Sequence, residues 1–268
     1  MLFFGLSTWV LAVVICAVMV GATLGGLFLG RRMGRSSETL REPLGVVQGA
    51  LIGFMGLVLA FGLSLALGRY ETRRADTVDE ANAIGTTYLR AQTLPEPVRT
   101  QTLDVLPRYT RTSITIATTV PGSAADERAL ADSQRDQRRL WALAGQALDL
   151  KPTDSAPRLY VESLNEMFDA QSTRVYALAN RVPTAVLLVE VAGAAVALAA
   201  LALHLALHLS TIRRGLAATA VAALLVSVLL VVTFDLDRPT RGLIRVPATP
   251  LVDVYTSMSE PPAADAPG

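Results

Sequence analysis

Apolar residues are concentrated in four long segments of the chain, at residues 7–30, 44–68, 184–209 and 215–234. A helix rises 1.5 Å per residue, so about 20 apolar residues cross a hydrocarbon core of about 30 Å. We therefore predict four transmembrane helices. Only the five residues STIRR separate the last two segments, which predicts that these two form an antiparallel hairpin.

The second apolar segment passes directly into a polar helical pattern, without a helix-stopping signal between Leu44 and about Leu94. Small residues recur in it every three or four positions: Gly45, Gly49, Gly53, Gly56, Ala60, Ser64 and Gly68. Such a strip allows another membrane helix to approach closely. Beyond the strip, apolar positions keep helical spacing while charges fill the other faces. We predict one helix that leaves the lipid near Arg69 and continues into water.

The first apolar segment has a small-residue pattern of its own, with Ala17, Gly21 and Gly25 four residues apart and Gly26 and Gly30 repeating the interval. We predict that this pattern packs against the glycine strip of the second segment. No Lys or Arg precedes the segment, and Arg31 and Arg32 follow it, which favours a retained span over a signal peptide. The lone Cys16 excludes an internal disulfide.

Residues 69–183 form the only stretch large enough for a soluble domain, and the stretch reads as helical throughout. Pro95 and Pro97 end the long helix, and TTVPGSAAD and KPTDSAP are turns. Ser123, three residues before Asp126, and Ser155 are predicted helix N-caps. Residues 235–268 form a charged turn, a candidate short amphipathic helix and a tail. The predicted fold is an all-α integral membrane protein with four transmembrane helices and a helical soluble domain inserted between the second and third.

The overall composition narrows the function classes. A mean hydropathy of +0.42 with 51% hydrophobic residues is too apolar for one soluble domain. A net charge of +1 gives no global field that would attract nucleic acid. The sequence contains no nucleophile elbow, Walker loop, dinucleotide fingerprint or zinc-protease helix. We therefore predict a non-enzyme without cofactor, with the lipid bilayer and small ions as partners.

A group of polar residues, here called the collar, lies where the long helix is expected to leave the membrane. It consists of Arg69, Glu71, Arg73, Arg74, Asp76, Asp79, Glu80 and Asn82. If several subunits placed this helix around a common axis, each position would become a ring, and rings of charge select ions. The alternative is a solvated helix face with ion pairs three or four residues apart.

Three ionisable residues of the third apolar segment, Glu190, His204 and His208, share one helical stripe. A charge in the hydrocarbon core costs roughly 2.5–3.5 kcal/mol, so these residues should face protein or water. They form either a proton or ion path, or an interfacial histidine pair with a protonated or paired glutamate. A His pair at i and i+4 can bind metal, but no third ligand is near, so we predict no metal site.

The fourth apolar segment is followed by a charged turn that contains Asp235, Asp237, Arg238 and Pro239. We predict a structural role for these residues, as a salt-bridged cap that holds the tail to the domain.

Three separated stretches resemble the bestrophin-like family of bacterial membrane proteins. They read GLVLAFGLSLALGRYETRRADTVDEANAIGTTYLRA, SLNEMFDAQSTRVYALANRVP and FDLDRPTRGLIRV, and the resemblance extends from about Gly49 to Val254. It implies the architecture of bestrophins, which are pentameric, wholly helical anion channels with four spans per subunit and a cytoplasmic helical domain. In bestrophins the second span lines the pore, which corresponds to residues 44–68 here. Phe54 and Phe61, seven residues apart, are then the candidate constriction, although the glycine-rich face departs from the aromatic constriction of animal bestrophins.

Two arguments about orientation disagree. No basic residue precedes the first span and four follow it, which by the positive-inside rule places the N-terminus and residues 69–183 outside. The resemblance implies that this domain and both termini are cytoplasmic. We adopt the second orientation, at a bacterial inner membrane, because long segments and later arginines blur the charge rule.

Two functions follow from these patterns. The first is an oligomeric channel, a pentamer by resemblance, that passes small ions, with anions as the expected class. The second is a non-conducting membrane scaffold or regulatory protein whose helical domain binds a partner.

Overall fold

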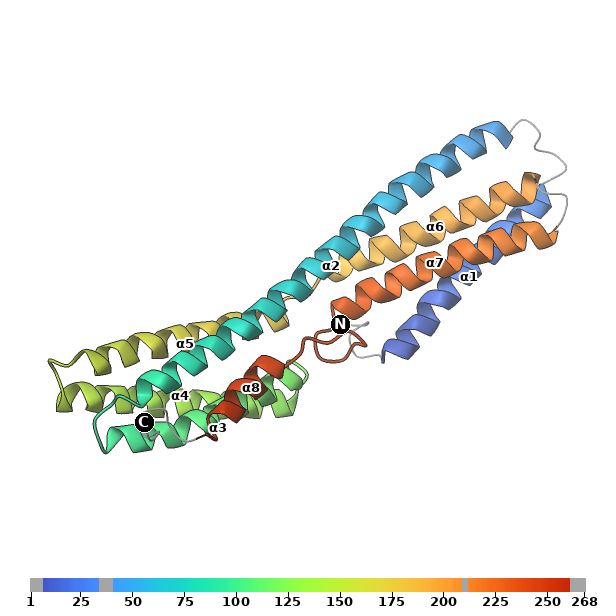
Figure 1. Cartoon of the computed structure of the whole chain (residues 1–268). Coiled ribbons are helices and arrows are strands. Elements are labelled where there is room, and N and C mark those ends of the chain that lie inside the picture. The colour runs from blue at the N-terminus through green and yellow to red at the C-terminus, as the bar shows by residue number, and fades with distance from the viewer. Residues whose placement is uncertain (1–6, 34–40, 209–211, 261–268) are drawn as a thin grey trace. The chain divides into compact units, whose positions relative to one another are not determined.

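The computed structural model describes residues 7–33, 41–208 and 212–260, and it is helical with short connections over those residues (Figure 1). The helices are α1 (Thr8–Met33), α2 (Arg41–Ala91), α3 (Val98–Thr118), α4 (Ala124–Leu150), α5 (Ser155–Ala179), α6 (Thr184–His208), α7 (Ile212–Leu236) and α8 (Thr249–Ser257). No strand occurs in the part of the chain that is described. The prediction of an all-helical fold is confirmed.

The chain divides into two compact units. Unit 1 comprises Met1–Arg69 and Arg181–Ile244, and unit 2 comprises Tyr70–Asn180 and Arg245–Gly268. Helix α2 has 51 residues without interruption and contributes to both units. Its continuity follows from the absence of Pro and of any capping signal between Leu44 and Ala91.

Unit 1 contains α1, the first part of α2, α6 and α7, and its core is built from their apolar faces. Buried core residues include Leu11, Ile15, Met19, Leu59, Leu187, Leu198, Leu230 and Phe234. Stretches of α1, α2, α6 and α7 are long and apolar enough to cross a membrane, judged by length and composition. Many of their other apolar side chains are exposed in the single chain, as expected of helices that face lipid or another subunit.

Glycines of α1 allow it to pack closely against α6. A Cβ atom at Gly26 would lie 2.9 Å from the Ala199 carbonyl carbon, and one at Gly30 would lie 2.7 Å from the Ala206 Cβ. By contrast, a Cβ at Gly49 or Gly53 of α2 would meet no atom within 4 Å. The prediction that α1 packs on the glycine strip of α2 is therefore wrong. Regular spacing of small residues identifies a close-packing face but does not identify its partner.

Unit 2 packs the second part of α2 with α3, α4, α5 and α8 around one apolar core. That core includes Ile84, Tyr88, Leu106, Tyr109, Leu140, Leu143, Tyr160, Leu164, Met167 and Leu251. The short helix α8 joins it through Leu251 and through Met258, whose carbonyl oxygen accepts a 3.2 Å hydrogen bond from the Tyr88 hydroxyl. This contact fixes the segment after residue 244 to unit 2.

The predicted caps can be compared with the observed helix ends. Ser123 caps α4, with its hydroxyl accepting a 3.2 Å hydrogen bond from the Asp126 amide. The Asp126 carboxylate in turn accepts a 2.8 Å bond from the Gly122 amide. At α5 the prediction is one residue off, because Asp154 occupies the N-cap position and Ser155 is the first helical residue.

Candidate functional site

The apolar part of α2 has one buried face and one open face. Met55, Leu59, Gly62 and Ala66 are buried, and a Cβ at Gly193 of α6 would lie 2.6 Å from the Met55 Cε. Successive residues are about 100° apart around a helix, so these positions share one side. That side packs against α6, and the rest of the segment is left open within the single chain.

The open face carries Gly49, Gly53 and Gly56 of the glycine strip and the two candidate constriction residues. Gly49, Gly53 and Gly56 are exposed and have no atom within 4 Å of an added Cβ. Phe54 and Phe61 are 63% and 67% exposed. Each Phe follows a strip position directly, so the rings lie about 100° around the helix from the strip. The two features therefore occupy different sides of the open face.

The collar residues divide into an exposed group and a buried group. Glu71, Arg74, Asp79 and Asn82 are exposed, and Arg69 and Asp76 are half-buried. Glu71 and Arg74, three residues apart on the helix, form an ion pair at 3.8 Å. Burial, and then repulsion by Asp79, raise the pKa of the Asp76 carboxyl, while the Arg174 cation lowers it to a smaller extent.

The buried collar residues, Arg73 and Glu80, bind α5. Arg73 donates hydrogen bonds from Nε to the Ala177 carbonyl at 3.0 Å and from Nη2 to the Asn180 carbonyl at 2.6 Å. A cation at this position satisfies the last carbonyls of α5 and complements the helix dipole. The Glu80 carboxylate forms an ion pair with Arg174, and both side chains are at most 1% exposed.

Polar side chains around Arg174 connect α5 with α3 and α4. The Gln171 carbonyl oxygen accepts hydrogen bonds from the Ser133 hydroxyl and the Gln137 amide, each 2.8 Å long. The Gln171 amide donates to the Ser113 hydroxyl at 2.8 Å, and Arg174 donates to the Ser113 carbonyl at 3.3 Å. Burial raises the pKa of the nearby Tyr109 hydroxyl and keeps it neutral. This network lies inside unit 2 and has the character of a structural core.

The candidate polar stripe of α6, Glu190, His204 and His208, changes from buried to exposed along its length. Glu190 is 1% exposed, and neither carboxylate oxygen has a hydrogen-bond partner among the described residues. His204 is half-buried, with its ring 3.1 Å from the Cβ that an alanine at Gly45 would carry. His208 is exposed, and its Nδ1 lies 2.9 Å from the His204 carbonyl oxygen. The two rings pack with centroids 4.2 Å apart.

The charged turn after α7 makes buried contacts within unit 1. The Asp235 carboxylate accepts hydrogen bonds from the Thr8 hydroxyl at 3.2 Å and from the Ile244 amide at 2.8 Å. Asp237 accepts a 3.0 Å bond from the Val182 amide, just before α6. Burial lowers the pKa of Arg238, and Asp235 opposes that change. Pro239 follows directly, and the turn ties together the first residue of α1, the approach to α6 and the end of α7.

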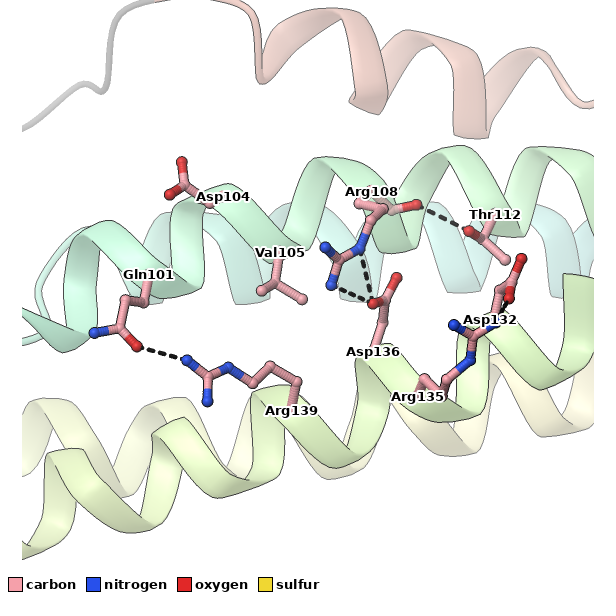
Figure 2. Close-up of a pocket in the computed structure, with 9 residues that line it drawn as sticks. All are labelled: Gln101, Asp104, Val105, Arg108, Thr112, Asp132, Arg135, Asp136 and Arg139. Carbon is pink, nitrogen blue, oxygen red and sulfur yellow. Dashed lines mark hydrogen bonds and ion pairs between the residues drawn. The ribbon is translucent and has the colours of Figure 1, made fainter.

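A polar pocket of about 700 Å³ lies between α3 and α4 of unit 2 (Figure 2). Its charged lining residues are Asp104, Arg108, Asp132, Arg135, Asp136 and Arg139. Arg108 donates to the buried Asp136 at 2.9 Å, and this hydrogen bond raises the pKa of Arg108. Figure 2 also shows Arg139 bonded to Gln101, at 2.8 Å. Three Arg and three Asp balance, so the pocket suits a polar partner of mixed charge better than a polyanion.

Residues 10–251, which make up most of the chain, match the sequence model of the Bestrophin-like domain. The chain belongs to the bestrophin-like family. No curated protein sequence matches it.

Solved structures have the same fold as this bestrophin-like chain. A bacterial bestrophin homolog from Klebsiella pneumoniae is 15% identical, with a TM-score of 0.68 over 89% of this chain and 96% of that chain. A point variant of that homolog gives a TM-score of 0.70 at 15% identity, over 91% and 97%. Another structure, described as a membrane protein, is 14% identical with a TM-score of 0.70, over 91% and 97%. At such identities the likeness concerns the fold.

The three stretches that resemble the bestrophin-like family supply the buried polar contacts described above. The first contributes Arg73 and Glu80, the second contributes Gln171 and Arg174, and the third contributes Asp235 and Asp237. Residue spacing had singled out neither Gln171 nor Arg174. The available signal was their place in a stretch that resembles the family, on the same helix face at i and i+3.

Proposed function

We propose that this chain is one subunit of an oligomeric, bestrophin-like channel that passes small ions, with anions as the favoured class. The family and the apolar helices support a membrane channel. The resemblance to bestrophins supports anions as the transported class and a pentamer as the assembly. Four spans, with residues 69–183 inserted between the second and third and with both termini on the cytoplasmic side of the inner membrane, complete the proposed topology.

The observation that carries the proposal is the open glycine face of α2. Glycine costs a helix about 0.5–1 kcal/mol relative to alanine at each interior position. Gly26 recovers such a cost by allowing α6 to approach. For Gly49, Gly53 and Gly56, in contrast, no atom of the described residues lies within 4 Å of the missing Cβ. We infer that α2 of another copy occupies this face, which places several α2 helices around one axis.

Such an arrangement assigns roles to the other features of α2. Phe54 and Phe61, on a different side from the strip, would project toward the axis and narrow the pore. The exposed collar residues would form rings where α2 leaves the membrane. Arg73 and Glu80 would support α2 against α5 and would not meet ions, because both are buried.

Purified full-length protein tests the proposal in two ways. In planar bilayers we expect currents in several chloride salts, and in native mass measurements we expect a closed oligomer. Gly53→Leu should reduce the oligomer, because the new side chain fills the open face. Gly25→Leu is the matched control, since Gly25 of α1 is also open. A monomeric wild type, or no current in any salt, would reject the channel.

The scaffold function is supported by one feature, the charged pocket between α3 and α4. If unit 2 binds a partner there, Arg139→Glu should abolish capture of that partner without changing the oligomer. An unchanged ion current in the same variant would separate the two functions.

A further inference from the structure

Glu190 is a buried acid whose oxygens have no hydrogen-bond partner among the residues that the structure describes. It lies in α6 and is 1% exposed, and neither Oε1 nor Oε2 has a hydrogen-bond partner in the described part of the chain. Six residues separate it from Thr184, the first residue of α6, which is about 9 Å of helix. The carboxyl is therefore placed inside the apolar segment and away from its ends.

The helices that surround Glu190 provide no cation at that depth. Glu190 is the only acidic or basic residue, histidine aside, in the four apolar segments 7–30, 44–68, 184–209 and 215–234. The other titratable groups in them are Cys16 of α1 and His204 and His208 of α6. His204 is 14 residues further along α6, about 21 Å away. On the near side, charges begin outside the segments, at Arg69, Arg181, Asp235, Asp237 and Arg238.

The Glu190 carboxyl packs directly against the backbone of α2, at a position where glycine provides no side chain. A Cβ atom at Gly62 would lie 2.6 Å from the Glu190 Cδ and 2.9 Å from its Oε2, and its nearest neighbours would all be Glu190 atoms. Gly62 is six residues from Gly68, the last residue of its apolar segment, just as Glu190 is six residues from the first residue of its own. Glu190 and Gly62 therefore lie at the same depth in their segments. Leu59 and Ala66, one turn to either side of Gly62, are buried. This contact position on α2, here called the Gly62 seat, is apolar, and it exists because Gly62 has no side chain.

We infer that Glu190 is an intramembrane proton-binding site, at which a neutral carboxylic acid is seated against Gly62. An ionised carboxylate without partners is strongly disfavoured in an apolar interior, and binding a proton removes that penalty. The neutral acid also needs no hydration at the Gly62 seat, whereas a carboxylate would have to draw in water or move. Proton occupancy is thereby coupled to the contact between α2 and α6.

The inference does not depend on ion conduction, so its test uses chemical labelling of the full-length protein in liposomes. An apolar carbodiimide adds to a protonated carboxyl, and the acylisourea rearranges to a stable N-acylurea that retains every atom of both reactants. At pH 7 an exposed carboxyl is under about 1% protonated. We expect Glu190 to be labelled at least about tenfold faster than the exposed Glu71, as read by peptide mass spectrometry. A water-soluble carbodiimide should label Glu190 poorly, and Glu190→Gln should remove the adduct.

Two α2–α6 variants test the seat itself. Gly62→Ala should displace the carboxyl and lower the ratio of apolar to water-soluble labelling. Gly193→Ala, whose Cβ meets Met55 and not Glu190, should leave that ratio unchanged. Equal labelling of Glu190 and Glu71, or labelling of Glu190 only after unfolding in detergent, overturns the inference. If sodium or potassium, compared with choline at the same ionic strength, protected Glu190 from labelling, the site would be a cation site. That result would also overturn the inference.

Discussion

Glu80 and Arg174 are a buried ion pair whose charges depend on each other. Both side chains are at most 1% exposed, so each ion has lost most of its hydration. Such a pair adds little net stability relative to an apolar pair of similar shape, but loss of one partner leaves a charge that is neither hydrated nor paired. The pair therefore constrains which residues can occupy these two positions together.

The first prediction concerns Arg174→Met. It should lower the free energy of unfolding by about 3–5 kcal/mol, because the Glu80 carboxylate is left buried without its cation. Combining it with Glu80→Leu should recover part of the loss. Denaturant titration of the full chain in detergent measures both. Arg135→Gln, which breaks the exposed pair with Asp132, should cost no more than about 1 kcal/mol. An Arg174→Met loss within that limit would contradict the prediction.

The second prediction concerns pH and Asp76. Burial and then Asp79 raise the pKa of this carboxyl in the folded state above its ordinary value of 3.8. The folded state thus holds the proton more tightly than the unfolded state, so the stabilisation is full below pH 3.8 and is lost as pH rises through the folded pKa. Asp76→Asn should consequently have a higher melting temperature than wild type at pH 7 but not at pH 3.5.

Asp169→Asn is the control for this measurement, because Asp169 is exposed on α5. If the difference in melting temperature between wild type and Asp76→Asn stayed constant with pH, or had the opposite sign, Asp76 would not titrate in this way.

Sequence could identify the collar but not the role of each member. Charge spacing showed that the group lies on one stretch of α2, whereas Glu80 meets its partner 94 residues away in the chain. Periodicity within one helix reports which residues share a face. It does not report which distant helix covers that face, so the burial of Arg73 and Glu80 required the fold.

At the scale of the helices, small residues decide how closely two of them pack. In α1, Gly26 meets α6 backbone while its neighbour Gly25 meets nothing within 4 Å. Adjacent glycines thus have opposite surroundings because they are about 100° apart around the helix.

The third prediction uses that adjacent pair. Gly26→Ala should destabilise the chain by about 1–3 kcal/mol, because its Cβ would overlap the Ala199 carbonyl group and would push α1 from α6. Gly25→Ala should be neutral or stabilising by up to about 1 kcal/mol, since alanine favours the helix and nothing obstructs it. Thermal unfolding in detergent measures both. Equal effects of the two substitutions would mean that the close contact between α1 and α6 does not form.

The helices themselves could be predicted from the sequence, and their pairing could not. Apolar length predicted the four membrane-type segments, and prolines and turn residues predicted the connections that precede α3, α4 and α5. The partner of the α1 glycines was predicted wrongly because α2 and α6 both offer small residues at similar spacing. Shape complementarity between whole helix faces, which spacing does not encode, selects between them.

At the scale of the whole molecule, the two units use buried polar contacts in similar ways. In unit 2, Arg73 binds the last carbonyls of α5, and in unit 1, Asp235 and Asp237 bind groups at the ends of α1 and α6. Helix ends leave backbone groups unpaired, and Arg73 binds carbonyls of this kind at the end of α5. Asp235 and Asp237 instead hold the Thr8 hydroxyl of α1 and the Val182 amide just before α6. The exposed collar residues Glu71, Arg74, Asp79 and Asn82 take no part in these contacts and face solvent in the single chain.

The fourth prediction follows from that division and rests on the proposed channel. Glu71→Gln and Arg74→Gln remove charges that are 56% and 58% exposed, so each should shift the reversal potential in a chloride gradient, in opposite directions. Removing the negative charge of Glu71 should favour the passage of anions, and removing the positive charge of Arg74 should disfavour it. Glu80→Gln should lower stability and leave the reversal potential unchanged, because Glu80 is buried against Arg174. Reversal potentials that respond to Glu80 and not to Glu71 or Arg74 would place the selecting charges elsewhere in the chain.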